Sequence, residues 1–185
     1  MTTVFIAGSI TIKSLDARVK ERIDKVVESG FDIVVGDADG ADAAIQRHLR
    51  DSGAKHATVY CSGRTPRNNV GNWAVQVVDT THAPGSRAFF TAKDLQMARR
   101  ADFGLMIWDT KSTGTLSNVI ELLARKKKSV VYVHKDKVFK NIATADDLEL
   151  LADGMAEPAR RKADEKIRLS QRLDELKHEQ VSMFA

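Results

Sequence analysis

The sequence predicts an α/β fold, a three-layer sandwich built around a mostly parallel sheet of five strands. Short apolar runs alternate with longer amphipathic stretches as far as residue 134, which is the pattern of parallel strands joined by crossover helices. The run 103–108 carries no charged residue, as expected of a strand that is covered on both faces. Small polar residues follow several of these runs, and open parallel sheets bind their ligands where the carboxyl ends of the strands meet.

Each element of this sheet has its own signal in the sequence. The expected strands are residues 4–7, 31–35, 57–61, 103–108 and 129–134, and the expected helices are residues 15–28, 41–49, 89–100 and 116–127. The first helix shows its period clearly, because Leu15, Val19 and Ile23 recur on one helical face. Gly30 follows its end, where a glycine commonly closes a helix. A polar segment, residues 62–87, separates the third strand from the third helix.

The pattern changes after residue 135, so we divide the chain into a Rossmann-like ligand-binding domain, residues 1–135, and a C-terminal helical extension, residues 136–185. Thr144 and Asp147 have the spacing of a capping box that begins a short helix. Residues 157–180 are expected to form a charged helix with a thin apolar stripe. Such a helix gains most of its stability by packing against its domain or a second subunit, and we expect a homo-oligomer.

Composition limits the partners and the cellular setting. The 185 residues carry a net charge of +4, which suits anionic ligands; since the sequence shows no clustered basic face, we do not expect nucleic acid as a partner. No apolar run is long enough for a transmembrane helix, and no membrane association is expected. The amino terminus lacks the basic region of a signal peptide, and the single cysteine, Cys61, excludes an internal disulfide. We therefore expect a cytoplasmic protein. We also expect no cofactor.

Two turns at strand ends carry candidate ligand-binding residues. Gly8 and Ser9 end the first strand, where a glycine lets a ligand approach the backbone and a serine can bond a phosphate or a ribose. Neither a G-x-G-x-x-G nor a P-loop fingerprint is present. After the second strand, Asp39 is placed to cap the next helix and Asp42 to favour its dipole. Asp37 is then left free for a ligand at the strand tip, and no metal is expected, because a single carboxylate cluster is a poor metal signal.

The segment 64–73 has the most unusual composition in the chain, with two arginines, three asparagines and an indole. Arginine forks suit phosphates, amides suit base or sugar edges, and an indole can stack on a base. We therefore expect this loop to contact a ligand and to close over it. The alternative is that the tryptophan is packed beneath the loop. The residues assigned to ligand contact are Arg64, Arg67, Asn68, Asn69 and Trp73.

The fourth strand and the helices on either side of it supply the remaining candidates. Asp109 follows that strand, and Gly114 with Thr115 opens the next helix, whose free N–H groups can bind an anion. Asn118 lies one turn later and can face the same pocket. Asp94, inside the preceding helix, is either a catalytic carboxylate or the partner of a Lys or Arg on its own helix.

Taken in order, these segments resemble the SLOG superfamily, which joins the LOG phosphoribohydrolases, the DprA and Smf proteins and Rossmann-like nucleoside-ligand binders. They are also similar to the nucleoside deoxyribosyltransferases. The resemblance covers residues 3–134 and rests on the segments 5–9, 36–42, 101–102 and 114–118. It implies a Rossmann-like fold and a nucleotide-like ligand. The catalytic glutamate of the LOG enzymes falls at Asn118 in this chain, and an amide cannot act as the carboxylate of N-glycosidic chemistry.

Three functions follow from these observations. The interpretation placed first is a sensor or sequestering protein that binds a nucleotide or nucleoside-derived small molecule through the ligand-binding residues named above. The second is an enzyme, an N-glycosidase, phosphoribohydrolase or ribosyl-transfer enzyme, in which Asp37, Asp94 or Asp109 replaces the missing glutamate. The third is a DprA-like binder of single-stranded nucleic acid, which needs a basic groove with stacking aromatic rings. Trp73 and its neighbouring arginines are the hint of such a groove.

Overall fold

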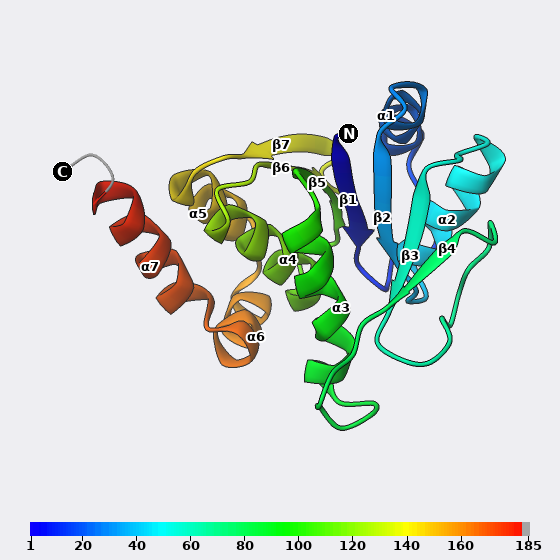
Figure 1. The fold of residues 1–185 in the computed structure, drawn as a ribbon. Helices are drawn as coiled ribbons and strands as arrows, with labels where there is room; N and C mark the ends of the chain where they lie inside the picture. The colour runs from blue at the N-terminus through cyan, green and yellow to red at the C-terminus, as the bar shows by residue number, and fades with distance from the viewer. Residues whose placement is uncertain (183–185) are drawn as a thin grey trace.

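The computed structural model describes residues 1–182, with Gln180 described by its backbone alone, so residues 183–185 of the expected extension lie outside the described residues. A seven-stranded sheet has the order β4-β3-β2-β1-β5-β6-β7 (Figure 1). The strands are β1 (Thr3–Gly8), β2 (Asp32–Gly36), β3 (Ala57–Cys61), β4 (Ala74–Val77), β5 (Phe103–Trp108), β6 (Ser129–Val133) and β7 (Val138–Ile142). The helices are α1 (Ala17–Glu28), α2 (Ala41–Asp51), α3 (Arg87–Arg100), α4 (Thr113–Ala124), α5 (Ala145–Asp153), α6 (Glu157–Ile167) and α7 (Leu169–Ser182).

The strand order places a topological switch point near the middle of the sheet. Neighbouring strands are parallel throughout, except that β6 and β7 are antiparallel. The chain begins with β1, adds β2 to β4 on one side, and then crosses to add β5 to β7 on the other. The order therefore reverses between β1 and β5, and the connecting loops leave this point in opposite directions. The register places Gly8 beside Ile107 here.

Two apolar layers cover the sheet. Helices α1 and α2 pack on one face, where Val19, Ile23 and Ile45 are fully buried. Helices α3 to α7 belong to the layer on the other face, which also encloses Phe5 and Trp108 (Figure 1). Within residues 1–182, no helix is both long and apolar enough to span a membrane.

The α/β class and the mostly parallel sheet are confirmed, but the sheet has two more strands than the five predicted. β4 lies in the segment expected to be a loop, and all four of its residues are exposed, so it lacks the apolar pattern that signals a strand. β7 lies in the stretch expected to be helical, and most of its residues are at least partly exposed. Both strands lie at the edges of the sheet, where burial does not shape the sequence.

The C-terminal extension also differs in detail from the prediction. The expected helix 157–180 is divided into α6 and α7 at Arg168, which has a left-handed φ of 53°. Leu173 of α7 is buried in this chain's own core, and Arg172 pairs with Glu121 of α4. The apolar stripe is thus used within the chain, while the homo-oligomer stays a prediction.

Candidate functional site

Hydrogen bonds of Ser9 join the carboxyl ends of β1 and β5. Its backbone N–H donates to the Ile107 carbonyl at 2.9 Å, and its buried hydroxyl accepts from the backbone N–H of Asp109 at 3.1 Å. The hydroxyl also lies 3.3 Å from that of Thr115. Gly8 permits this close packing, because a Cβ there would lie 2.7 Å from the Ile107 oxygen. The two predicted ligand-binding residues therefore join two strands and a helix.

Asp109 organises the turn that leads into α4. Its carboxylate accepts from the Thr11 hydroxyl at 2.7 Å and from the backbone N–H groups of Lys111 and Ser112 at 2.9 and 2.6 Å. Burial raises the pKa of Asp109, but these hydrogen bonds outweigh burial, and the pKa is lowered overall. The ionised carboxylate thus shapes the entry to the helix.

The amino terminus of α4 brings positive charge to this edge of the sheet. Ser112 caps the helix by accepting from the Thr115 N–H at 3.3 Å, and the first N–H groups of a helix have no partner within it. The space beside Gly114 is open, because the nearest atom to an added Cβ would be 4.0 Å away. From the start of α3, the exposed Arg87 donates to the Thr113 hydroxyl at 3.2 Å. An arginine beside a helix amino terminus suits a phosphate.

Asn118 lies one turn further along α4 and is buried, with 7% of its surface exposed. Its side chain makes no hydrogen bond to another residue within the described part of the chain. A buried amide in this state has donor and acceptor capacity left over. The structure therefore keeps Asn118 close to Thr115 without giving it a role in the fold.

A buried lysine lies among three aspartates at the end of β2. Lys93 of α3 has 5% of its side chain exposed and donates to Asp94 at 2.8 Å. Asp42 is buried at the start of α2. A Cβ on Gly36 would come within 2.3 Å of the Asp42 carboxylate and 2.7 Å of the Lys93 ammonium, so the glycine makes room for both groups. Asp37 follows directly and is also buried.

The buried Asp42 gives the protein a pH-dependent stability. Burial raises its pKa from 3.8 to about 6, and the charge of Lys93 opposes this only in part. Between about pH 4 and pH 6, Asp42 keeps its proton in the folded chain but loses it in the unfolded chain. The stabilising effect of this proton is therefore full below about pH 4 and is lost as the pH rises through about 6. The Asp42→Asn variant lacks this titration. We therefore expect its free energy of unfolding, relative to that of the wild type, to rise by on the order of 2–3 kcal/mol between about pH 4.5 and pH 8. Urea unfolding at both pH values measures the difference; an equal difference at both contradicts it.

The loop after β3 is fastened to the β2–α2 turn. The Arg67 guanidinium bonds both oxygens of Asp37, at 3.1 and 2.8 Å, and the Arg67 backbone N–H donates to the same carboxylate at 3.0 Å. Burial raises the pKa of Asp37, but the hydrogen bonds from Arg67 outweigh it, and the pKa is lowered. Asn68 donates to the Asp37 carbonyl and to the Asp39 carboxylate, both at 3.0 Å. Asp37 is thus engaged within the protein, whereas the sequence suggested a free carboxylate.

Trp73 and Asn69, at the other end of this loop, serve the fold. The indole N–H of Trp73 donates to the Ala54 carbonyl at 2.9 Å, and the ring packs against the apolar layer that contains α2. The Asn69 amide bonds the Trp73 backbone twice, at 2.8 and 3.0 Å. The partly buried indole is thus bonded and packed within the fold, while its contact with a ligand stays a prediction.

Arginines and phenylalanines from separate segments come together at the start of α3. The Arg67 guanidinium carbon lies 4.6 Å from the centre of the Phe90 ring, and Phe90 is 36% exposed. Phe89 meets Phe90 edge to face, with ring centres 5.3 Å apart. The exposed Arg64 and the partly buried Phe89 line an adjacent hollow of about 350 Å³. We call Arg64, Arg67, Arg87, Phe89 and Phe90 the arginine–phenylalanine surface.

The two phenylalanines were not among the predicted site residues, because apolar side chains in a helix commonly serve the core. A signal was present, since neighbouring residues of a helix point about 100° apart, so that Phe89 and Phe90 together cover a wide arc of the helix. Arg87 lies three residues before Phe90 and therefore shares its side of the helix. This combination marks an exposed aromatic and cationic helix face.

Two acidic residues of this region, the buried Asp37 and the partly buried Asp94, are engaged with cations. Asp37 pairs with Arg67, and Asp94 pairs with Lys93. Across residues 1–182, no group of three or more His, Cys, Asp and Glu side chains is arranged to hold a metal ion. The surface chemistry available to a partner is therefore that of exposed guanidinium groups, an aromatic ring and a helix amino terminus.

Comparison with solved structures finds a similar fold in a DNA-binding protein. The chain resembles DNA processing protein A (DprA) from Helicobacter pylori, reported for its unique single-stranded DNA binding mode, with a TM-score of 0.50 and 16% sequence identity. The likeness covers 70% of this chain and 64% of the DprA chain, so this chain spans less than two thirds of that protein. At this identity the likeness shows a shared Rossmann-like fold. No protein-family model and no curated protein matches the chain.

This comparison supports the expected Rossmann-like fold and corrects two other expectations. The function placed first, a small-molecule sensor or sequestering protein, is overturned because a structural neighbour, DprA, is a single-stranded DNA binder. The expectation that nucleic acid is not a partner is wrong on the same ground. The physical reason is that a net charge of +4 does not tell where arginines gather, and the fold gathers residues that the sequence keeps far apart.

Proposed function

We propose that this chain binds single-stranded DNA across the arginine–phenylalanine surface and the amino terminus of α4. The observation that carries the proposal is the stack of Arg67 on the exposed ring of Phe90. Proteins that bind single strands without reading their sequence combine cations, which track the backbone, with aromatic rings, on which bases stack. The single-stranded DNA binding of the similarly folded DprA supports the same assignment.

Phosphates fit the end of this surface where α3 and α4 begin. Arg87 uses one N–H toward Thr113, and a guanidinium has five donors in a fork that matches phosphate oxygens. Lys111 is exposed directly before the α4 cap and adds a second charge. The open space at Gly114 lets a phosphate approach the backbone N–H groups of the first helical turn.

A base fits the exposed part of the Phe90 ring. The guanidinium of Arg67 lies over that ring, and Asp37 fixes the guanidinium from the other side, so the stacking group is ordered before a strand arrives. Asp39 and Asp79 are exposed carboxylates near the loop and the adjacent hollow. Because they repel phosphates, we expect the DNA backbone to run on the Arg87 side of the ring.

Fluorescence anisotropy with a labelled dT strand of about 20 nucleotides tests the proposal. We expect saturable binding that weakens with salt, because each neutralised phosphate adds about 0.7 to the slope of log affinity against log salt concentration. A duplex of the same length competes less well, since its paired bases cannot stack on Phe90. The mononucleotide dTMP does not compete at equal nucleotide concentration, because it spans part of the surface. Absence of binding at low salt, or full competition by dTMP, contradicts the proposal.

A further inference from the structure

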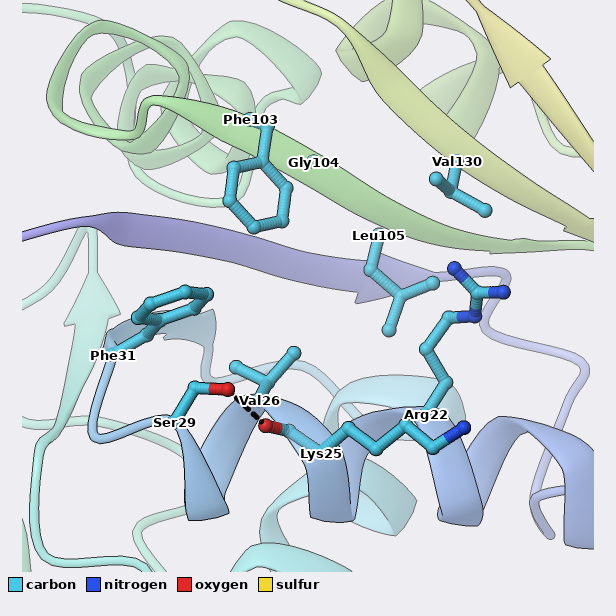
Figure 2. A pocket seen from close by; sticks show the side chains of 9 residues that line it. All are labelled: Arg22, Lys25, Val26, Ser29, Phe31, Phe103, Gly104, Leu105 and Val130. Carbon is cyan, nitrogen blue, oxygen red and sulfur yellow. Dashed lines mark hydrogen bonds between the residues drawn. The ribbon is translucent and has the colours of Figure 1, made fainter.

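A second hollow lies between α1 and the amino ends of the strands, on the opposite edge of the sheet from the arginine–phenylalanine surface (Figure 2). Its volume is about 370 Å³, which is within the range of small-molecule sites. Side chains from β5, β6 and the residue before β2 face it from the sheet, and α1 forms its other wall. The residues that matter for its chemistry are Arg22, Lys25, Phe31, Phe103, Leu105 and Val130.

The floor of this hollow is apolar and incompletely covered. In the described chain, α1 and α2 form the apolar layer on this face, and Phe103, Val130 and Phe139 remain partly buried at its margin. Phe31 and Phe103 meet edge to face, with ring centres 6.2 Å apart. The arrangement leaves aromatic surface available to a flat apolar group, which gains by leaving water.

The charged groups that line the hollow are all positive. The Arg22 guanidinium carbon lies 4.4 Å from the centre of the Phe139 ring, and the Lys25 side chain extends along the same helix (Figure 2). No acidic residue is part of the lining, and neither cation has a carboxylate partner within residues 1–182. An apolar floor beside two uncompensated cations is complementary to an amphiphilic anion.

We propose that this hollow is a binding site for an organic anion with a flat aromatic body. The ring lies against Phe31 and Phe103, and the carboxylate, sulfonate or phosphate pairs with Arg22 and Lys25. A second copy of the chain fits less well, because a two-fold interface would bring Arg22 and Lys25 of both copies onto one patch. The site is separate from the proposed DNA surface and does not depend on it.

The aromatic sulfonate 8-anilinonaphthalene-1-sulfonate is a direct probe of this site, and the uncharged N-phenyl-1-naphthylamine is its matched control. We expect the sulfonate to saturate at one probe per chain, as measured by fluorescence titration. The double variant Arg22→Gln/Lys25→Gln should weaken sulfonate binding at least tenfold and change binding of the uncharged probe less than twofold. Lys20→Gln, an exposed lysine of α1 outside the lining, should leave both affinities unchanged.

A second variant tests the location. Val130→Trp should fill the hollow from β6 and abolish binding of both probes; because Val130 is partly exposed, the melting temperature should stay near that of the wild type. If Val130→Trp does not fold, the double variant Arg22→Gln/Lys25→Gln still tests the proposal. Both of its positions are exposed, so this variant is expected to fold. Unchanged sulfonate binding in the double variant overturns the proposal. Displacement of the sulfonate by the dT strand overturns it as well, and so does a concentration-dependent dimer that Val130→Trp abolishes.

Discussion

Replacing Lys93 with methionine is expected to lower the free energy of unfolding by about 3–5 kcal/mol near pH 8. The ammonium group is buried beside Asp94 and Asp42, with 5% of the side chain exposed. Burial lowers the pKa of Lys93, but the charges of Asp94 and Asp42 outweigh burial and raise it, so the lysine is charged at this pH. Its removal leaves carboxylates that can neither return to water nor find a cation.

The loss should be smaller near pH 5, because Asp42 can then hold a proton. Urea unfolding of both proteins at the two pH values gives the comparison. Lys20→Met, the same change at an exposed lysine, should alter stability by less than about 0.5 kcal/mol. The double variant Lys93→Met/Asp42→Asn should recover part of the loss, since the two residues act in one cluster. A Lys93→Met protein as stable as the wild type at pH 8 would show that the lysine does not hold the carboxylates.

The double variant Arg64→Gln/Arg87→Gln is expected to weaken binding of the dT strand by a factor on the order of 100. Each lost hydrogen bond to a charged phosphate is worth about 1.5–3 kcal/mol, which is roughly tenfold or more in affinity. The salt slope should fall by about 1.4, because two phosphate contacts are removed at about 0.7 each. Both side chains are exposed, so the melting temperature should change little. Equal salt slopes in variant and wild type contradict the phosphate assignment.

Phe90→Ala tests the other half of the same surface. We expect it to cost about 1–3 kcal/mol of binding free energy, the usual contribution of a stacked base, while the salt slope stays unchanged because no phosphate contact is lost. Arg50→Gln is the control for both experiments, because this exposed arginine lies on α2 and pairs with Asp51 at the surface. Full affinity in Phe90→Ala would show that no base stacks on this ring.

The central strands could be predicted from the sequence because burial on both faces selects continuous apolar runs. The edge strand β4 could not, since Val75 and Val77 are exposed and their backbone pairing with β3 leaves no trace in residue type. The break at Arg168 was missed for a similar reason. A charged surface helix offers few apolar positions that could mark where it ends.

The candidate site was harder to predict, because its contacts join distant parts of the chain. Asp37 looks free in the sequence, yet Arg67, which neutralises it, lies 30 positions further on. Arg87 meets Thr113 across 26 positions. For Trp73, composition favoured stacking on a ligand, whereas a hydrogen bond to Ala54 places the indole in the fold. Residue types thus indicated the chemistry of the region. The contacts between loops that lie far apart in the sequence determine which of these polar groups remain available to bind a partner.

The fastening of the loop after β3 has a consequence for the speed of recognition. Asp37 and Asp39 hold Arg67 and Asn68, and Gln46 accepts from the Val70 backbone N–H at 2.9 Å. A segment ordered in this way has given up its conformational entropy during folding and has little left to lose on meeting a partner. For the proposed capture of a single strand we therefore expect no slow rearrangement, and an association rate set by diffusion and by the attraction between guanidinium groups and phosphates.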